Sequence, residues 1–586
     1  MAAAHRDPAG ADRSSVGIAL TEKRVLRRGE LPDFLNFGLD QRWGEAHSRR
    51  EKPLAVGEAS GAQIRSKNGV WLRGMSPSLS SPAIDMKYHT IIVGAGSAGC
   101  VLAARLSENS GHSVLLLEAG PDYPTLADLP SEIRNAFNPA FTHDWGYASE
   151  PGSLGRTIPL PRGKLVGGCS ATNAAIALRG APSDYDEWAA RGNQGWSFSE
   201  VLPFFRRIER DADFDNSWHG RDGPLPIRRD PPDTLLPEHR AFLRACSALG
   251  YPPVADHNAP GAIGAGMWPR NVVAGIRQSA ALTYLAAARG RPNLTTNSGV
   301  LVDRVAFEDH RAVGVRLGGS TETIRANRVI LSAGAFGSPA ILMRSGLGPA
   351  DHLKSMGISV LRDLPGVGRN LSDHPLLALR SAAPAAAESI DLPGCQAVLT
   401  LKSSDSNVGQ DLQIFPWTIP PAEPGENPVF EIYVALMKTD SRGWLRLGSS
   451  DPADAPVVDL GYFTDPGDML RMIHALRAAR RLARTRPLSD LARQELFPGP
   501  QTTDADADLE SAIRTRVGTY FHPAGTCRMG PAADATAVVD SRGSVHGVEG
   551  LSVVDASIMP NIPAANTNLP TLMLAERCSA WLAGVG

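Results

Sequence analysis

A histidine and an asparagine near the carboxyl end of the chain have the residue types and spacing that best suit chemistry. His522 stands between Phe521 and Pro523, and Asn566 follows 44 residues later, where Ala565–Pro570 is expected to open a helix. A neutral imidazole can take the proton of a hydroxyl while an amide donates to the hydroxyl oxygen. A lone histidine is more often structural, so the pair is a hypothesis, and it predicts proton abstraction from an alcohol.

Such chemistry needs a fold that holds a cofactor, and the strongest pattern for one lies within residues 88–120. Tyr88–Val93 is a short β-branched run typical of a buried parallel strand, and it leads into the glycine-rich turn Gly94–Gly99. A helix follows, then the strand Ser113–Leu117, which ends at Glu118. Such a turn brings backbone N–H groups to a pyrophosphate, and the carboxylate suits ribose hydroxyls. The unit predicts a bound dinucleotide, NAD or FAD.

Three further stretches are expected to enclose the cofactor. Arg162–Ala174 is a second glycine-rich loop that can approach a planar ligand, although taken alone it could equally be a structural turn. The predicted strand 328–332 ends in Ala333–Ala335, at the carboxyl edge of the same parallel sheet. Asp555 follows the predicted strand Leu551–Val554 and is expected to contact the cofactor rather than to act as a catalytic carboxylate. These loops favour FAD.

The later part of the chain predicts a different kind of sheet. Residues 349–430 are rich in proline, and Phe430–Met437 and Gly443–Leu447 look like antiparallel strands. Asp468–Ala483 is expected to be a helix whose arginines form a solvated face. We therefore predict an α/β protein with a Rossmann-like FAD-binding domain and a substrate-binding domain that contains an antiparallel sheet.

The predicted domain boundaries follow from these patterns. Residues 1–85 lack a sustained period and are expected to form a disordered extension, so that Met86 is a candidate for the natural start. Residues 86–375 are assigned to the main part of the FAD-binding domain, with insertions from the substrate domain. Residues 376–535 form the main part of the substrate-binding domain, and 536–582 return to the FAD-binding domain.

Composition excludes several classes of function. The 586 residues carry 59 basic and 61 acidic side chains, a net charge of -2, which argues against a nucleic-acid partner. The six cysteines are scattered without a C-x-x-C pair, so we predict no metal site and no disulfide framework, and we expect a reducing cytoplasm. No apolar run of about eighteen residues is present, so no transmembrane segment is expected.

Five stretches, in this order, resemble the glucose-methanol-choline (GMC) family of flavoproteins: VGAGSAG, LLLEAGP, RGKLVGGCSATNA, FHPAGTCRMG and VVDASIMPNIPAANTNLPTLMLAE. The resemblance covers residues 87–582. It implies the GMC fold and FAD-dependent oxidation of a primary alcohol to an aldehyde by hydride transfer to flavin N5, with His522 as the catalytic base and Asn566 as its partner. The tail is most similar to bacterial 5-(hydroxymethyl)furfural oxidases and aryl-alcohol oxidases, which implies an aromatic or furanic alcohol. Pyridoxine 4-oxidases and choline-type or aliphatic alcohol dehydrogenases are also similar.

The resemblance also implies which residues hold FAD. They are Gly94, Gly96, Ser97, Ala98, Gly99, Glu118, Ala119, Arg162, Gly163, Leu165, Gly167, Gly168, Asn173, Ala174, Val302, Ala333, Gly334, Asp555, Ala556, Asn566 and Thr567. Phe521 is expected to line the substrate pocket, where the furfuryl-alcohol oxidases carry an indole, so the width of the pocket should differ. The histidine to which some members link flavin is missing from Val166–Ala174, which implies non-covalent FAD.

Two rival functions share this fold. The fold resembles the fold of hydroxynitrile lyases and of light-driven fatty acid decarboxylases. A flavin-binding protein without catalysis is a further alternative. The pairing of His522 with Asn566 favours alcohol oxidation. The expected partners are a small-molecule alcohol and an electron acceptor, O2 or another carrier, while the sequence leaves the acceptor and the oligomeric state open.

Overall fold

The computed structural model describes residues 88–383, 394–403, 409–419 and 429–584. The extension expected at residues 1–85 lies outside them. The described residues build two seven-stranded sheets, one largely parallel and one antiparallel, as well as several two-stranded ribbons.

The first sheet is organised around β1 (Tyr88–Val93), which has the bounds predicted for it. It lies parallel to β2 (Val114–Leu117) on one side and to β11 (Thr323–Leu331) on the other, so that Ile91 is level with Leu115 and with Val329. Ile91 is fully buried, as expected for a parallel strand covered on both faces. The remaining strands are β8 (Leu294–Asn297), β9 (Val302–Glu308), β10 (Arg311–Leu317) and β22 (Leu551–Val553).

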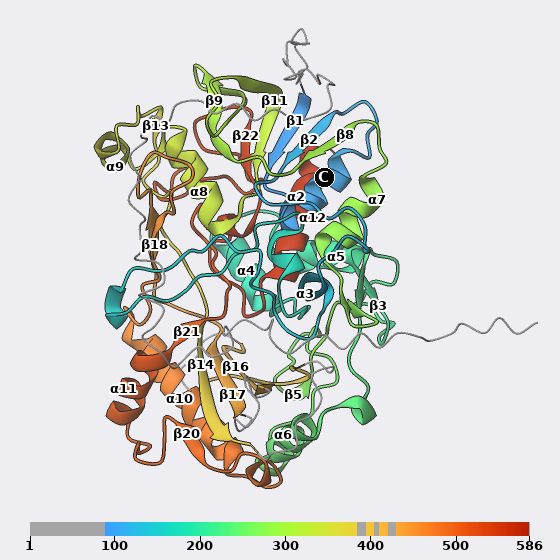
Figure 1. The fold of residues 1–586 in the computed structure, drawn as a ribbon, viewed down its shortest axis with the longest axis vertical. Helices are drawn as coiled ribbons and strands as arrows, with labels where there is room; N and C mark the ends of the chain where they lie inside the picture. The colour runs from blue at the N-terminus through green and yellow to red at the C-terminus, as the bar shows by residue number, and fades with distance from the viewer. Residues whose placement is uncertain (1–87, 384–393, 404–408, 420–428, 585–586) are drawn as a thin grey trace, which may run out of the picture. The chain divides into compact units, whose positions relative to one another are not determined.

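The strand β22 brings the carboxyl-terminal part of the chain into this sheet. It pairs in parallel with β11, and Leu551 is level with Val329. Figure 1 shows β22, in red, beside the green β11. The return of late residues to the first sheet places Asp555 at the same sheet edge as Ala333 and Gly334, which follow β11.

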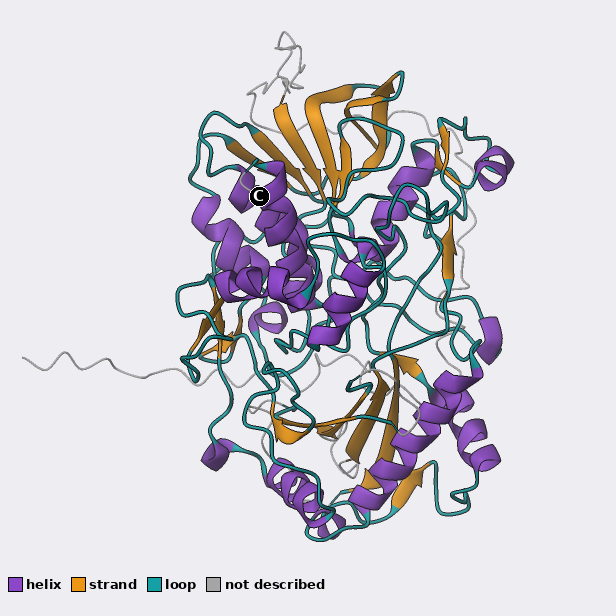
Figure 2. Ribbon diagram, turned by 180° about the vertical axis from the view of Figure 1, so that it is seen from behind, coloured by secondary structure: helices purple, strands orange, loops and turns teal. Residues whose placement is uncertain are grey.

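Two helices that are distant in sequence pack together, and the first of them lies on β1 and β2 of this sheet. They are α2 (Ser97–Leu106) and α12 (Asn568–Leu582), and Figure 2 shows the purple helices gathered at one face of the orange sheet. Buried Glu576 accepts from Arg105 Nε at 3.0 Å and from Tyr284 Oη at 2.8 Å. This charged contact joins the first helix of the cofactor unit to the last helix of the chain.

The second sheet has the order β20-β14-β17-β16-β15-β5, with β21 paired to β14. Its strands are β5 (Gly264–Met267), β14 (Pro375–Ala382), β15 (Ala397–Leu401), β16 (Leu412–Ile419), β17 (Val429–Leu436), β20 (Glu495–Phe497) and β21 (Gly518–Thr519). The prediction that Phe430–Met437 forms an antiparallel strand is confirmed by β17. It does not pair with Gly443–Leu447, however, because β18 (Trp444–Arg446) pairs with β19 (Val457–Asp459).

The helix expected at Asp468–Ala483 is confirmed as α10 (Pro466–Ala483), which packs on β17. The prediction of a solvated arginine face is wrong for two of its arginines. Arg471 is buried and lies 2.5 Å from Asp468, and Arg480 is buried and lies 2.7 Å from Asp504. Paired carboxylates allow these guanidinium groups to leave water.

The other helices are short or connect strands along the chain. They are α3 (Ser131–Arg134), α4 (Pro182–Ala190), α5 (Phe198–Ile208), α6 (Pro237–Ala248), α7 (Ala286–Ala288), α8 (Gly334–Arg344), α9 (Ala350–Ser355) and α11 (Asp506–Arg516). The remaining ribbons are β3 (Glu209–Asp211) with β4 (Leu225–Ile227), β6 (Val272–Val273) with β7 (Ile276–Arg277), and β12 (Leu347–Gly348) with β13 (Arg362–Asp363). In the part of the chain that the structure describes, every helix is too short or too polar to cross a membrane.

Candidate active site

The two predicted glycine-rich loops meet, backbone against backbone. The N–H of Gly167 donates to the carbonyl of Ala95 at 2.7 Å. A Cβ on Gly168 would lie 2.7 Å from the Cα of Gly96, and a Cβ on Gly94, where φ is +97°, would lie 2.6 Å from the carbonyl oxygen of Ser332. Side chains at these positions would push the loops apart, which explains the need for glycine.

The start of α2 suits the phosphates of a dinucleotide. Its N-cap, Gly96, offers no side-chain cap, and its first turn, which begins at Ser97, carries no acidic residue. The first N–H groups of the helix and its positive dipole end are therefore left to a ligand. A Cβ on Gly96 would find its nearest atom 4.0 Å away, so the chain itself leaves open the space beside this residue.

Glu118 ends β2 beside this turn, as predicted for a ribose contact. Its two carboxylate oxygens each accept a backbone N–H at 2.9 Å, from Ala95 and from Gly120. Each oxygen keeps a further lone pair that can accept from a hydroxyl. Val302, also predicted to contact the cofactor, opens β9 beside β10. It follows Val300 by two residues, and the N–H of Val300 donates to the carbonyl of Glu118 at 2.8 Å.

The carboxyl-terminal return is fixed to the turn after β11. Buried Asp555 accepts from the N–H of Gly334 at 2.9 Å, from Ser338 Oγ at 2.6 Å and from the N–H of Ser557 at 2.8 Å. Ser97 Oγ donates to Asn568 Oδ1 at 2.9 Å. The predicted cofactor loops therefore converge at one edge of the first sheet.

Other predicted cofactor residues have structural contacts of their own. Leu165 is buried with Ile133, Asn173 Oδ1 accepts from the N–H of Ala175 at 2.9 Å, and Gly163 donates to Cys169 Sγ at 3.3 Å. Among the remaining ones, Ala98 and Gly99 lie in the first turn of α2, Ala119 and Ala174 lie in the two loops, and Ala556 and Thr567 lie in the return.

His522 and Asn566 are brought together as the sequence predicts. The Nε2 atom of His522 and the Nδ2 atom of Asn566 are 3.3 Å apart, and both residues are only 8% exposed. Asn566 Oδ1 has no hydrogen-bond partner. A hydroxyl that enters between the two side chains can donate to the imidazole and accept from the amide.

Strong contacts hold the backbone of His522 in place. Its N–H donates to Asp373 Oδ1 at 2.8 Å, and the other oxygen of Asp373 accepts from Tyr462 Oη at 2.8 Å and from Thr519 Oγ1. Phe521, just before the base, has φ of +65°, a conformation that is costly for a bulky residue.

The predicted cofactor residue Arg162 also acts on this strained segment. Its Nη2 donates to the carbonyl of Phe521 at 2.7 Å. The ring of Phe521 lies edge-on to that of Phe141, with centroids 6.0 Å apart. These contacts fix the direction of the peptide that joins Phe521 to His522.

Burial sets the protonation state of the base. It lowers the pKa of His522 well below the usual value for histidine, and nearby His374 and Arg162 lower the pKa further. The pKa of His374 is lowered to about 3, mainly by burial. Both imidazoles are therefore neutral near pH 7, and His522 is able to accept a proton.

Asp373, His374 and Tyr462 also belong to the site, although no sequence pattern indicated them. The Nδ1 atoms of His374 and His522 are 3.0 Å apart. The available signal was an Asp-His pair directly before Pro375, where β14 begins. Nothing local in the sequence connects Asp373 or His374 with His522, which lies 148 residues after His374.

One face of the second sheet is aromatic and adjoins the base. Phe415 stacks on Tyr433 with centroids 5.2 Å apart, and on Tyr520 at 5.6 Å, while Tyr520 lies 4.4 Å from the ring of His522. Glu431, on the next row of this face, lies 2.9 Å from Arg380 Nε. The face offers flat rings and a carboxylate that is already paired.

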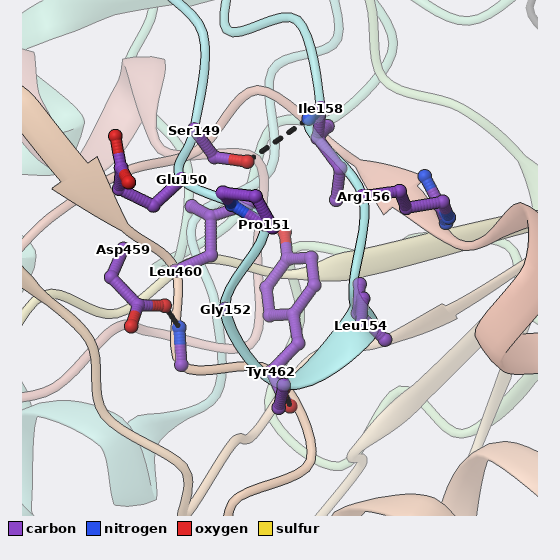
Figure 3. Close-up of a pocket in the computed structure, with 12 residues that line it drawn as sticks. Ser149, Glu150, Pro151, Gly152, Leu154, Arg156, Ile158, Asp459, Leu460 and Tyr462 are labelled. Carbon is purple, nitrogen blue, oxygen red and sulfur yellow. Dashed lines mark hydrogen bonds between the residues drawn. The ribbon is translucent and has the colours of Figure 1, made fainter.

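Figure 3 shows a separate small pocket, lined by 149–154, Arg156, Ile158 and 459–462. It contains neither His522 nor Asn566. The ring of Tyr462 forms part of its wall, and the hydroxyl of the same residue supports Asp373. Tyr462 thus links this pocket to Asp373, but the pocket is not the predicted active site.

One buried group in the described residues has the types that bind metal ions. Ligand atoms of Glu209, Asp211 and His219 lie within 4.8 Å of one another. Arg179 bonds Glu209, and Arg229 Nη1 lies 2.5 Å from Asp211. The chain's own cations thus balance these carboxylates, and the pKa of His219 is raised to about 10 through its bonds to carboxylates. The prediction of no metal site stays a prediction.

Comparison with known proteins gives a consistent result. Two family models, both described as GMC oxidoreductase, match residues 88–376 and 439–575. The mitochondrial choline dehydrogenase of Mus musculus is 35% identical over 85% of this chain and 90% of its own length. The crystal structure of pyridoxine 4-oxidase from Mesorbium loti has a TM-score of 0.78 at 33% identity and covers 84% of this chain and 99% of its own. An FAD-dependent oxidoreductase from Chaetomium thermophilum has a TM-score of 0.77 at 26% identity, over 85% of this chain and 99% of its own.

Proposed function

The chain belongs to the GMC oxidoreductase family, FAD-dependent enzymes that act on CH–OH donors, and on that premise we propose that it oxidises a primary alcohol to an aldehyde with His522 as the base. The observation that carries the proposal is the buried pair of His522 Nε2 and Asn566 Nδ2 at 3.3 Å. A neutral, fixed imidazole beside an amide donor is suited to take a hydroxyl proton.

The chain offers a fitting cradle for FAD. Glycines 94, 96 and 168 keep the crossing of the two loops free of side chains, α2 begins without a cap, and Glu118 keeps lone pairs for ribose hydroxyls. We propose that these groups hold the pyrophosphate and adenosine, and that the loop Arg162–Ala174 with the return Asp555–Thr567 encloses the flavin. When bound, FAD supplies the acceptor for the hydride.

In the proposed reaction, the protein positions the alcohol and moves one proton. Asn566 Nδ2 donates to the alcohol oxygen, and His522 Nε2 takes the hydroxyl proton as the hydrogen on the α-carbon departs as hydride. Because the pKa of His522 is lowered by burial, the base is ready at neutral pH. Burial of both residues keeps water away from the reacting oxygen.

We propose an aromatic or furanic primary alcohol as the substrate. The stack of Tyr520, Phe415 and Tyr433 supports this, because flat rings favour stacking with a flat substrate. A choline-type alcohol is the second candidate, supported by the similarity to choline dehydrogenase. Recognition of a quaternary ammonium group also uses aromatic rings. The pairing of Glu431 with Arg380 favours the neutral substrate, since the carboxylate charge is already compensated.

A substrate panel tests the proposal. The FAD-loaded chain is mixed anaerobically, in the dark, with 5-(hydroxymethyl)furfural, a benzylic alcohol, pyridoxine and choline, and the loss of yellow flavin absorbance is recorded. Faster reduction by the furanic and benzylic alcohols is expected. Faster reduction by choline would favour the second candidate, and flavin that stays yellow with every alcohol would contradict alcohol oxidation and favour a lyase or decarboxylase.

We also propose how FAD is attached, where the domains divide and where the protein is located. FAD is expected to be non-covalent, so acid precipitation should release the flavin into the supernatant, whereas flavin in the pellet would contradict this. The division into 86–375, 376–535 and 536–582 is supported by the pairing of β22 with β11. Cytoplasmic location is proposed from the scattered cysteines. Reoxidation by O2 or by another acceptor is proposed without preference.

A further inference from the structure

His374 is a second buried imidazole in direct contact with the base. Its Nδ1 atom lies 3.0 Å from Nδ1 of His522, and the two rings are nearly perpendicular, at 84°. Burial keeps both rings neutral, as their lowered pKa values indicate. A hydrogen bond between two neutral imidazoles needs one N–H and one lone pair, so the two rings must hold complementary tautomers.

The other end of His522 decides which ring donates. Its Nε2 atom faces Nδ2 of Asn566, and an amide nitrogen can only donate. Nε2 must therefore offer its lone pair, which leaves the single proton of neutral His522 on Nδ1.

The surroundings of His374 agree with this assignment. Its Nδ1 must accept from His522, so its own proton belongs on Nε2. Burial lowers the pKa of His374, while the backbone carbonyls of Met437 and Pro563 act on the ring as acceptors and oppose this shift. The Nε2 atom of His374 is buried and has no hydrogen-bond partner. Because Nδ1 already faces His522, Nε2 is the nitrogen left to carry the single proton of neutral His374.

We propose that His374 is a positioning residue that holds His522 in the Nδ1–H tautomer, so that Nε2 is the nitrogen presented to the alcohol. This rests on the function proposed above. When the alcohol O–H bond breaks, the new N–H bond forms at Nε2, and the Nδ1–H bond of His522 stays directed at His374. His374 does not pass the proton on, because its Nε2 has no hydrogen-bond partner to receive one.

Neighbouring residues thus hold the base at two points. Asp373 accepts from the backbone N–H of His522 at 2.8 Å, and His374 accepts from its ring. Both stand directly before β14, whose pairing with β21 places Pro375 opposite Thr519, three residues before the base. The antiparallel sheet therefore carries the alignment of the catalytic imidazole.

Two variants of His374 test the assignment in the FAD-loaded full chain. His374→Leu removes the acceptor for His522 Nδ1–H, while His374→Asn can place its Oδ1 near the position of the lost nitrogen. We expect the rate constant of flavin reduction by the alcohol to fall about 10- to 100-fold in the first variant and to return to within about fivefold of wild type in the second. His239→Leu, at another buried neutral histidine, is the matched control and should leave the rate unchanged.

A direct measurement of the tautomer separates positioning from a merely structural role. In the chain labelled with 15N-histidine, the His522 signals are assigned by their loss in His522→Ala. We expect an Nδ1–H signal for His522 in wild type and in His374→Asn, and a shift toward Nε2–H in His374→Leu.

An Nε2–H tautomer in wild type, or an unchanged tautomer and rate in His374→Leu, would overturn the inference. If His374→Leu does not fold, the tautomer of wild type and the rate of His374→Asn still decide. A wild-type flavin that no alcohol reduces would contradict the proposed function, while the tautomer measurement would continue to test the inference by itself.

Discussion

Replacing Asp373 should weaken both the fold and the base, by an amount that depends on the substitute. Its carboxylate is 2% exposed and accepts from the N–H of His522 at 2.8 Å, from Tyr462 Oη at 2.8 Å and from Thr519 Oγ1. It also accepts from the N–H of His374 at 2.9 Å, so that four buried donors depend on its oxygens.

The two substitutions differ in how many donors they leave without a partner. Asp373→Asn keeps an oxygen for the N–H of His522, and the two hydroxyls can rotate to accept from its amide. Hydrogen bonds to a charged group are worth about 1.5–3 kcal/mol and neutral ones about 1 kcal/mol, so the unfolding free energy should fall by about 1–3 kcal/mol. Asp373→Ala leaves four donors unsatisfied at about 1–3 kcal/mol each, so we expect a loss of at least about 4 kcal/mol.

Urea unfolding and stopped-flow flavin reduction measure these effects on the FAD-loaded chain. We expect Asp373→Asn to keep the reduction rate within about tenfold of wild type and Asp373→Ala to lose more than that, because the backbone of His522 is released. Asp468→Asn is the matched control, since this buried carboxylate also accepts two backbone N–H groups but lies at the start of α10. An Asp373→Ala variant with wild-type stability and rate would show that neither the fold nor the base depends on this carboxylate.

Burial lowers the pKa of His239 to about 3 and that of His257 to about 4. Below about pH 6.5, the unfolded chain therefore binds more protons at these two histidines than the folded chain does. The unfolding free energy should then fall by up to about 1.4 kcal/mol per pH unit for each, and equal values in urea titrations at pH 7 and pH 5 would contradict this. Gly96→Ala should lower the FAD content of the protein without changing the stability of the apoprotein, because the chain leaves room for the methyl group and the bound cofactor would not. Gly290→Ala, at another uncrowded glycine, is the control. Full FAD content in Gly96→Ala would place the pyrophosphate elsewhere. Asn566→Ala should slow flavin reduction about 10- to 100-fold with an unchanged melting temperature, and a wild-type rate would remove the amide from the reaction.

The features that the sequence predicted best are those encoded by neighbouring residues. The bounds of β1 and the turn at Gly94 were predictable because a β-branched run and its glycines act within a few residues. The meeting of His522 and Asn566 was expected from family resemblance, since no spacing rule joins residues 44 apart.

The features that were missed depend on pairing across long stretches of chain. His374 and Asp373 reach His522 only because β14 pairs with β21. The burial of Arg480 beside Asp504 likewise depends on a later loop that folds back on α10. Composition cannot distinguish such a buried ion pair from a solvated charge, because both use the same residues.

Anaerobic mixing of an FAD-retaining His522→Ala variant with a substrate alcohol measures whether His522 removes the hydroxyl proton. Flavin reduction is expected to slow by about two to four decades relative to wild type, the usual contribution of a positioned general base. Flavin reduction at the wild-type rate in this variant would mean that another group takes the proton.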